Sequence, residues 1–357
     1  MKIAVVGNYL PRQCGIATFT HNFVNAILTS FSNKEIRPKI FVIAMNRNDQ
    51  HFDYPVIVEC TIRQDFHKDY MNAARYNKSS GADLCVLQHE YGIYGGESGV
   101  FILSLLEAIQ IPVTVIFHTV LKTPSFHEKY VLRYIGEHAA QVVVMNRLAI
   151  EFLTTIYRIP EEKIAMIHHG VPDFGLLKRG KEKIFNFPGK TVMCTFGFLG
   201  RNKGIETVIR ALPEVVALHP NIVYIILGKT HPNVKLDSGE EYRNYLKQLV
   251  ENNNLSNHVV FLDEFLEEEK LKEALLGVDI YITPYLNEAQ ITSGTLAYAV
   301  GSGTCIVSTP YWHANELLAD GRGKFFGFGD SNDLANVLNE LLDDPDSIKA
   351  TRENAFS

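Results

Sequence analysis

Short β-branched runs alternate with helical patterns along the whole chain, and this alternation constrains the fold more than any other feature of the sequence. The first half contains the runs "KIAVV", "KIFVIAM", "DLCVLQ", "PVTVIFH" and "QVVVM". The second half contains "VMCTFG", "IVYIILG", "HVVFL", "DIYIT" and "CIVS". Strands that alternate with helices form parallel sheets whose crossover helices cover both faces. The sequence therefore predicts an α/β fold with two doubly wound, Rossmann-like domains.

A segment between the two halves marks the predicted domain boundary. Residues 168–190, "HHGVPDFGLLKRGKEKIFNFPGK", are rich in Gly, Pro and Lys and show no sustained period. We expect an N-terminal domain over residues 1–172, a linker over 173–190 and a C-terminal domain over 191–357. Ligands of open parallel sheets bind beyond the carboxyl ends of the strands. Two such domains facing each other would place their loops on one cleft.

The charge and the cysteine pattern argue against several classes of protein. A net charge of -6 does not suit a nucleic-acid binder, which usually carries a basic domain or stripe. The five cysteines are scattered and form no C-x-x-C pair, so neither a disulfide framework nor a zinc site is indicated. No stretch approaches the roughly 20 apolar residues of a membrane span. We expect a cytoplasmic protein without a nucleic-acid partner, and peripheral membrane contact is not indicated.

The loop "GFLGRNKG" at the start of the second half is suited to an anion. Gly197, Gly200 and Gly204 surround Arg201 and Lys203, and a helical pattern follows. Each charge-assisted contact from such a lysine or arginine to a phosphate is worth about 1.5–3 kcal/mol. The alternative is a solvated basic turn, which the glycines make less attractive.

Two further helix starts carry small residues. Ser293, Gly294 and Thr295 stand directly before an apolar helical pattern, and Gly15 precedes another. Helix starts expose unpaired N–H groups and the positive end of the helix dipole. An ordinary N-cap is the alternative for residues 293–295. The distance between Gly7 and Gly15 does not fit a dinucleotide fingerprint, which disfavours NAD. Three such starts on one cleft predict a diphosphate ligand.

The order of the motifs resembles the retaining GT-B glycosyltransferases of the large family four, the group 1 glycosyltransferases. The motifs are the Gly15 loop, "QHEYGIYGG", "FHTV", "HHGVPD", "GFLGRNKGIETVIRAL", "ITSGTLAYAVGSGTCIVS" and "PYWHANELLADGRG". The resemblance implies transfer of a hexose from a UDP- or GDP-linked sugar to a glycan or small-molecule acceptor, with retention of configuration. It also implies that the C-terminal domain holds most of the donor, that the N-terminal domain holds the acceptor, and that neither a cofactor nor a metal is obligatory.

The resemblance also implies roles for individual residues. His118, Lys203 and Arg201 are the expected catalytic residues, with Lys203 and Arg201 on the diphosphate and His118 near the transferred sugar. The expected donor-binding residues are Gly15, Gly197, Lys203, Gln290, Ser293, Gly294, Thr295 and Tyr298. His89 and Glu90, which follow a buried-type strand, are candidates for contact with the acceptor or for proton transfer. A turn with a satisfied histidine is the alternative for these two.

Three departures from the family pattern stand out. Gln290 and Tyr298 occupy the places of two family glutamates, and Glu288 lies two residues from the first place. Phe198 stands where an arginine usually follows the strand glycine. The sequence ends at "ATRENAFS", where such enzymes normally continue into helices that cross back to the N-terminal domain, so we expect those crossing helices to be missing.

For several further residues, and for the function itself, the sequence allows more than one interpretation. Trp312, His313 and Glu316 follow a predicted strand, and sugar recognition at a cleft rim is one interpretation of them. The Asp-x-Asp from Asp344 to Asp346 fits a solvated turn better than a metal site. A non-catalytic nucleotide-sugar-binding or partner-binding relative is the alternative to a transferase, because the two glutamates are missing. A nucleotide-sugar epimerase of the same fold lacks support from the motif order.

Overall fold

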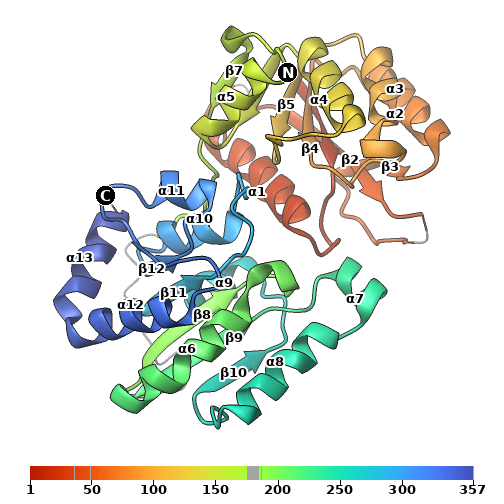
Figure 1. The fold of residues 1–357 in the computed structure, drawn as a ribbon. Helices are drawn as coiled ribbons and strands as arrows, with labels where there is room; N and C mark the ends of the chain where they lie inside the picture. Colours follow the sequence, from red (N-terminus) through yellow and green to blue (C-terminus); the bar gives the residue numbers. More distant parts are fainter. Residues whose placement is uncertain (36, 49, 175–184, 186, 357) are drawn as a thin grey trace. The chain divides into compact units, whose positions relative to one another are not determined.

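The chain forms two compact α/β units, Met1–His169 and Gly170–Ser357 (Figure 1). The computed structural model describes residues 1–356 except 36, 49, 175–184 and 186. Most of the segment expected as a linker, 173–190, therefore lies outside the described residues. Each unit has its own parallel sheet and its own core, and each is described by itself below.

The first unit is built on a seven-stranded parallel sheet in the order β3-β2-β1-β4-β5-β6-β7. Its strands are β1 (Lys2–Gly7), β2 (Lys39–Asn46), β3 (Val58–Arg63), β4 (Leu84–His89), β5 (Val113–Phe117), β6 (Gln141–Val144) and β7 (Ile164–Met166). The strands β1, β2 and β4 are buried along most of their length, as expected for strands covered by helices on both faces.

Three helices of the first unit, α1, α4 and α5, begin at side-chain caps. The helices of this unit are α1 (Gly15–Ser30), α2 (His67–Ser80), α3 (Ile102–Ala108), α4 (Phe126–His138) and α5 (Arg147–Thr155), with short 3₁₀ turns η1 (Glu97–Gly99) and η2 (Glu161–Lys163). The Cys14 thiol caps α1, and Ser125 with Glu128 forms a reciprocal capping box on α4. These caps fix where the capped helices start relative to the preceding strand.

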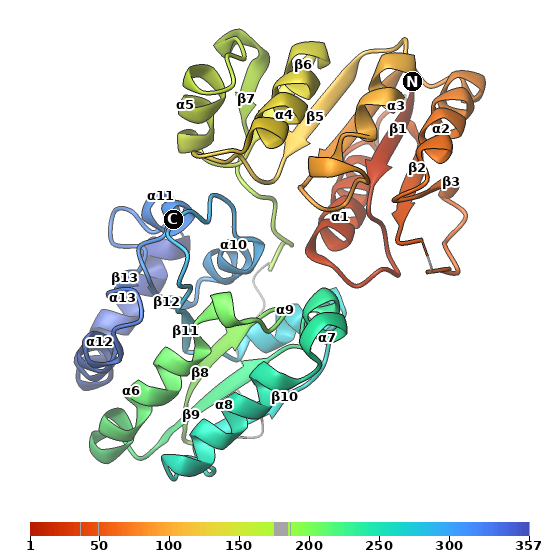
Figure 2. The same cartoon turned by 45° about the vertical axis from the view of Figure 1, so that its right-hand side comes forward.

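The second unit is built on a six-stranded parallel sheet in the order β10-β9-β8-β11-β12-β13. Its strands are β8 (Thr191–Phe196), β9 (Ile222–Leu227), β10 (Val259–Leu262), β11 (Ile280–Thr283), β12 (Cys305–Ser308) and β13 (Lys324–Phe325). Its helices are α6 (Ile205–Leu218), α7 (Pro232–Ser238), α8 (Glu241–Asn252), α9 (Glu268–Leu276), α10 (Gly294–Gly301), α11 (Trp312–Leu317), α12 (Ser331–Asp343) and α13 (Pro345–Phe356), with the 3₁₀ turn η3 (Arg201–Lys203). Figure 2 shows these elements turned by 45°.

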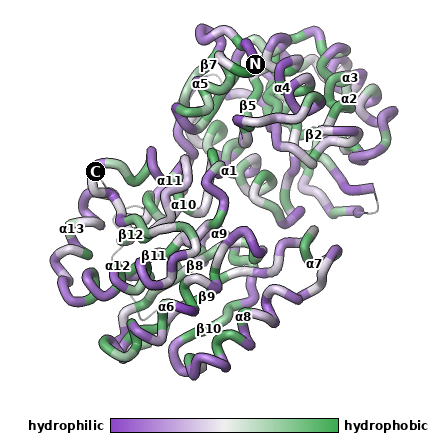
Figure 3. Tube along the Cα trace, viewed as in Figure 1, coloured by the Kyte–Doolittle hydropathy of each residue, from purple (hydrophilic) through white to green (hydrophobic). Residues whose placement is uncertain are grey.

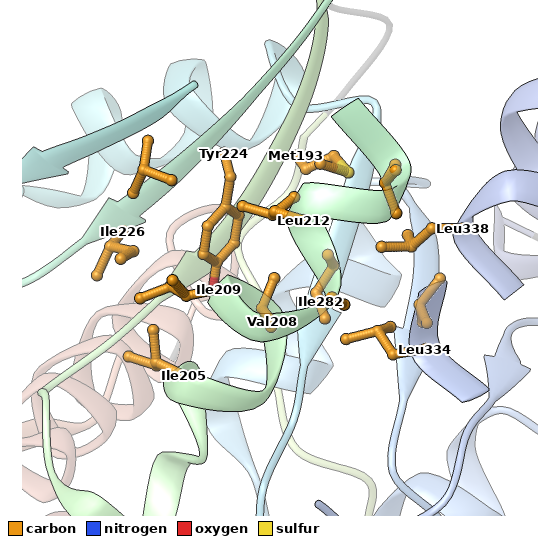
Figure 4. Packing of buried hydrophobic residues seen from close by; sticks show 14 of the residues in the cluster. Met193, Ile205, Val208, Ile209, Leu212, Tyr224, Ile226, Ile282, Leu334 and Leu338 are labelled. Atoms are coloured by element: carbon orange, nitrogen blue, oxygen red, sulfur yellow. The ribbon is translucent and has the colours of Figure 1, made fainter. Parts of the chain in front are cut away.

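The sheet of the second unit has a separate apolar layer on each face. On one face α6 and α12 pack against the strands through residues that include Ile209, Leu212 and Leu338 (Figure 4). On the other face α10 and α11 pack against the alternate strand residues. Because side chains point to opposite faces along a strand, neighbouring residues of β8 serve different layers, as Met193 and Cys194 do.

The remaining helices carry polar outer faces. The mostly polar (purple) α8 and α13 in Figure 3 bury only part of their surface, and the buried apolar residues of α8 are Tyr242, Leu246 and Val250. None of the helices in the described part of the chain is long and apolar enough to cross a membrane.

Candidate functional site

The ends of β4 and β5 bring together three of the four candidate residues of the first unit. His89 is the last residue of β4, Glu90 follows it, and His118 comes directly after β5. The His118 N–H donates to the His89 carbonyl at 3.0 Å, so the two strand ends are tied together. Parallel strands end at one edge of a sheet, which explains why segments about thirty residues apart meet here.

Buried polar contacts hold the side chains of His118 and Glu90. The Nε2 of His118 lies 2.8 Å from Oε1 of Gln88, and its ring meets Phe19 edge-on at 4.7 Å between centroids. The Thr119 hydroxyl donates to Oε2 of Glu90 at 2.7 Å. Gln88 was not among the predicted site residues, although a glutamine at the end of the apolar run "DLCVLQ" is a signal of a buried polar role.

Burial shifts the pKa of all three groups. It lowers the pKa of His89 to about 3, so this imidazole is neutral at pH 7. It also lowers the pKa of His118 to about 3, with smaller contributions from His169 and His89. Burial raises the pKa of Glu90 to about 7, although hydrogen bonds from Thr119 and the Tyr91 N–H oppose the shift. The strand ends thus hold two neutral imidazoles and one carboxyl that titrates near neutrality.

Gly15 is the first residue of α1 and has open space around it. A Cβ atom built at Gly15 would meet nothing within 4 Å. The helix cap comes from the preceding Cys14, whose Sγ accepts from the Ala17 N–H at 3.4 Å. No packing contact in the described residues therefore requires a glycine here.

In the second unit, the loop after β8 packs closely on the loop after β11. Gly204, which ends η3 with φ +62°, is so close to the next loop that a Cβ atom would lie 2.2 Å from the Pro284 carbonyl oxygen. The Leu286 N–H donates to the Asn202 carbonyl at 3.1 Å. Gly197, with φ +128°, lies beside the start of α10, since a Cβ atom there would be 3.1 Å from Cγ2 of Thr295. The glycine loop and the helix start are neighbours in this unit.

Lys203 lies on the face of a buried tyrosine that also contacts the start of α10. Its Nζ is 3.8 Å from the centroid of the Tyr285 ring, a cation–π arrangement. The Tyr285 hydroxyl is 2.8 Å from Oγ1 of Thr295, which in turn is 3.2 Å from Oγ of Ser293. Lys203, Ser293, Gly294 and Thr295 are therefore brought together. Tyr285 was missed because no sequence motif contains it.

The Lys203 charge affects the groups around it. Burial alone would raise the pKa of Tyr285, but the Lys203 ammonium and the hydrogen bonds from Thr295, Lys203 and Ser293 outweigh it and hold the pKa below its ordinary value. Burial lowers the pKa of His231, and the Lys203 charge lowers it further. The Lys203 ammonium contributes to both shifts, because a nearby positive charge favours the anionic form of a phenol and the neutral form of an imidazole.

Arg201 points to a different place from Lys203. Its Nη2 is 2.5 Å from Oε1 of Glu241, and its guanidinium lies 5.7 Å from the ring centroids of Tyr242 and Tyr245 on α8. The structure thus pairs Arg201 with α8 and does not join it to the start of α10. Its role on a phosphate stays a prediction.

Gln290, Tyr298 and Phe198, the three residues that depart from the family pattern, each contact other residues of the second unit. Nε2 of Gln290 donates to the Thr292 carbonyl at 2.5 Å, within the same loop. Tyr298 is only 8% exposed and belongs to the apolar layer under α10. Phe198 stacks on Phe265 at 5.5 Å and meets His231 edge-on at 5.4 Å. Their roles toward a donor stay predictions.

The remaining candidates lie near α11 and α12. His313 is buried, and its Nδ1 accepts from the Ser293 N–H at 2.8 Å, so its ring contacts the helix start instead of solvent. Oδ1 of Asp344 accepts from the N–H groups of Asp346 and Ser347 at the start of α13. Among the described residues, no group of three His, Cys, Asp or Glu side chains is arranged to hold a metal ion.

Two parallel-sheet α/β units with these loops define a GT-B fold, and solved structures agree with it. The chain aligns over its whole length with Anabaena HepE, crystallised with UDP and with UDP and glucose, at a TM-score of 0.73, 16% identity and 94% coverage of that chain. It aligns equally completely with WaaG, a glycosyltransferase involved in lipopolysaccharide biosynthesis, at a TM-score of 0.68, 16% identity and 94% coverage of that chain. At such identity the likeness shows the fold alone.

Sequence comparison supplies the family. Residues 178–357, half of the chain, match the model described as "Glycosyl transferases group 1". The chain belongs to the group 1 glycosyltransferases.

Curated relatives share part of their length with the chain. A glycosyltransferase of Methanocaldococcus jannaschii is 26% identical over 241 residues, which are 66% of this chain and 57% of that protein. The phosphatidyl-myo-inositol mannosyltransferase of Mycolicibacterium smegmatis is 28% identical over 168 residues, which are 45% of this chain and 38% of that protein. The chain thus spans 57% of the length of the first relative and 38% of the length of the second.

Proposed function

We propose that this chain transfers a hexose from a UDP- or GDP-linked sugar to a glycan or small-molecule acceptor, with retention of configuration. The second unit takes the nucleotide diphosphate, and the first unit contributes His118 and the acceptor contacts His89 and Glu90. No cofactor is proposed besides the donor itself. The UDP-bound structures of HepE support the nucleotide class, and the family membership supports transfer.

The observation that carries the proposal is the meeting of Lys203 with the start of α10. The ammonium lies over Tyr285, and the Tyr285 hydroxyl contacts Thr295 in the first turn of that helix. A cation and a helix start beside each other supply two independent attractions for an anion. A diphosphate has the charge and the size to use both.

This arrangement fits the charge that develops during transfer. Cleavage of the sugar–phosphate bond gives the sugar oxocarbenium character and leaves negative charge on the departing diphosphate. Lys203 and the N–H groups of α10 are fixed before the reaction, so they stabilise that charge without reorganisation. His118 is neutral near pH 7 and acts toward the sugar as a hydrogen-bonding group, not as a cation.

Replacement of Lys203 tests the proposal. Lys203→Ala removes a charge-assisted contact that strengthens as the leaving group gains charge, so we expect kcat/KM to fall about a hundredfold or more, with a smaller loss of donor affinity. The matched control is Lys349→Ala, which removes an exposed lysine on α13 whose only ion pair in the described residues, with Glu353, spans 3.9 Å. Transfer kinetics with UDP- and GDP-sugars and calorimetric binding of UDP and GDP are the measurements.

Replacement of His118 tests the role proposed for the first unit. His118→Ala should lower turnover while donor affinity is largely kept, because His118 is assigned to the sugar and not to the phosphates.

Transfer should persist in excess EDTA, because Lys203 and α10 neutralise the leaving group. Normal turnover and nucleotide affinity in a folded Lys203→Ala protein would reject the diphosphate assignment.

A non-catalytic nucleotide-sugar-binding or partner-binding protein is the second candidate. The replacement of two family glutamates by Gln290 and Tyr298, and the pairing of Arg201 with Glu241, favour it. It predicts that UDP or GDP binds and raises the melting temperature, but that no nucleoside diphosphate is released from any UDP- or GDP-sugar in the presence of acceptors. Measured release above the background hydrolysis rate would decide for the transferase.

A further inference from the structure

The first backbone N–H groups of α10 have different partners, and the partners decide which of them remain open. The Leu296 N–H donates to Oγ of Ser293 at 3.3 Å, and the Ala297 N–H donates to the Ser293 carbonyl at 3.1 Å. The Ser293 N–H donates to Nδ1 of His313 at 2.8 Å. Within the described residues, the N–H groups of Gly294 and Thr295 have no hydrogen-bond acceptor.

His313 belongs to α11, which is fastened to the loop before α10. The His313 N–H donates to the Gln290 carbonyl at 3.1 Å, and the Trp312 N–H donates to the Glu288 carbonyl at 3.0 Å. Together with the bond from Ser293, three hydrogen bonds join residues 288–293 to the first turn of α11. The His313 side chain is 1% exposed, so this contact lies inside the unit.

The ring nitrogen that accepts from Ser293 also fixes the state of His313. Nδ1 accepts only when it carries no proton, so the neutral ring holds its proton on Nε2. A protonated ring would offer a donor to the Ser293 N–H and lose the bond. His313 therefore contributes a fixed acceptor at one point of the loop.

We propose that His313 is a positioning residue for the donor site: by taking the Ser293 N–H, it orients the loop so that Gly294 and Thr295 present their two N–H groups to a diphosphate. The inference rests on the proposed function, because it assigns the diphosphate to this helix start. His313 itself does not touch the ligand. This positioning role is an alternative to sugar recognition by His313.

Two nearly isosteric replacements isolate the acceptor. His313→Asn keeps an acceptor oxygen near the position of Nδ1, whereas His313→Leu has almost the same shape and no acceptor. Both variants lose the same ring volume, so a difference between them reports the hydrogen bond. We expect His313→Leu to bind UDP or GDP about tenfold more weakly, the effect of one lost hydrogen bond, and His313→Asn to stay close to the wild type.

Nucleoside binding distinguishes the loss of a diphosphate contact from a general disruption of the second unit. Calorimetry with uridine and guanosine should give the same affinity for all three proteins, because a nucleoside lacks the phosphates. Equal loss in the Asn and Leu variants, equal retention in both, or parallel loss of nucleoside binding would overturn the positioning role. If the wild type binds neither UDP nor GDP, the proposed function fails and the inference fails with it.

Backbone amide spectra of the unmodified protein give a second measurement that needs no variant. Addition of UDP or GDP should shift the amide signals of Gly294 and Thr295 strongly and that of Ser293 weakly, because His313 already occupies the Ser293 N–H. The imidazole nitrogen signals of His313 should show a protonated Nε2 and a bare Nδ1 before and after addition. A dominant shift at Ser293, or the opposite tautomer, would contradict the proposal.

Discussion

At the ends of β4 and β5, burial favours the neutral form of three side chains. It lowers the pKa of two histidines and raises the pKa of one glutamate. His89 and His118 stay neutral because burial lowers the pKa of each to about 3. Glu90 stays protonated up to about pH 7 because burial raises its pKa. Near neutral pH, Glu90 is thus the group of the three that changes charge. A carboxyl of this kind can accept a proton from an acceptor hydroxyl at the pH of the cell.

Glu90→Gln is expected to change the pH dependence of stability. The folded protein binds a proton at Glu90 between the ordinary pKa of 4.5 and about 7, so this group makes the protein less stable as pH rises through that window. The histidines act in the opposite direction below pH 6.5, and the comparison of variant with wild type cancels them. Urea unfolding should therefore show the variant gaining stability relative to wild type as the pH rises from 4.5 to about 7. A difference in stability between variant and wild type that does not change with pH would contradict the shift.

Close backbone contacts between loops fix the spacing of the strand ends in the second unit. Gly204 precedes α6, and its left-handed φ together with the Pro284 carbonyl leaves no room for a side chain. Gly228, with φ +146°, follows β9, and a Cβ atom there would lie 2.0 Å from the Gly197 carbonyl oxygen. These contacts hold the ends of β8, β9 and β11 at the spacing that the loop with Lys203 requires.

Two glycine substitutions are expected to have opposite effects on folding. Gly204→Ala should destabilise the second unit by more than the roughly 1 kcal/mol of the left-handed backbone alone, because the Pro284 carbonyl must also move. Gly15→Ala should leave stability unchanged or raise it by up to about 1 kcal/mol, because alanine favours a helix and meets no atom there. Denaturant midpoints measure both. A destabilised Gly15→Ala protein would show a folding role for that glycine.

At the scale of the whole molecule, each unit folds around its own core. A nucleotide held mainly by the second unit should therefore stabilise that unit first. At 100 times its dissociation constant, a ligand adds about 2.7 kcal/mol to the state that binds it. Hydrogen exchange should slow in β8, β9 and β11 on addition of UDP or GDP and change less in β1 and β4. Equal slowing in both units would place the nucleotide contacts elsewhere than proposed.

The alternation of strands and helices was enough to predict the fold, because buried parallel strands leave apolar runs that local sequence displays. The GT-B fold and the glycosyltransferase family are confirmed. Motif order also singled out Lys203, Ser293 and Thr295, which the structure brings together. Tyr285 and the contact of His313 with Ser293 were missed, because they join segments that only the folded sheet places side by side. The direction of the Arg201 side chain was also out of reach, since its partner Glu241 lies forty residues away.

The contact between Gly228 and Gly197 has a consequence for laboratory evolution of this chain. Position 228 is closed to every side chain for steric reasons that have nothing to do with chemistry, whereas the Lys203 side chain is partly exposed. A library screened for soluble expression would therefore retain only glycine at 228 and tolerate several residue types at 203. A library screened for sugar transfer would restrict the residue types at both positions, so the positions at which the two screens differ would map the donor site without a known acceptor.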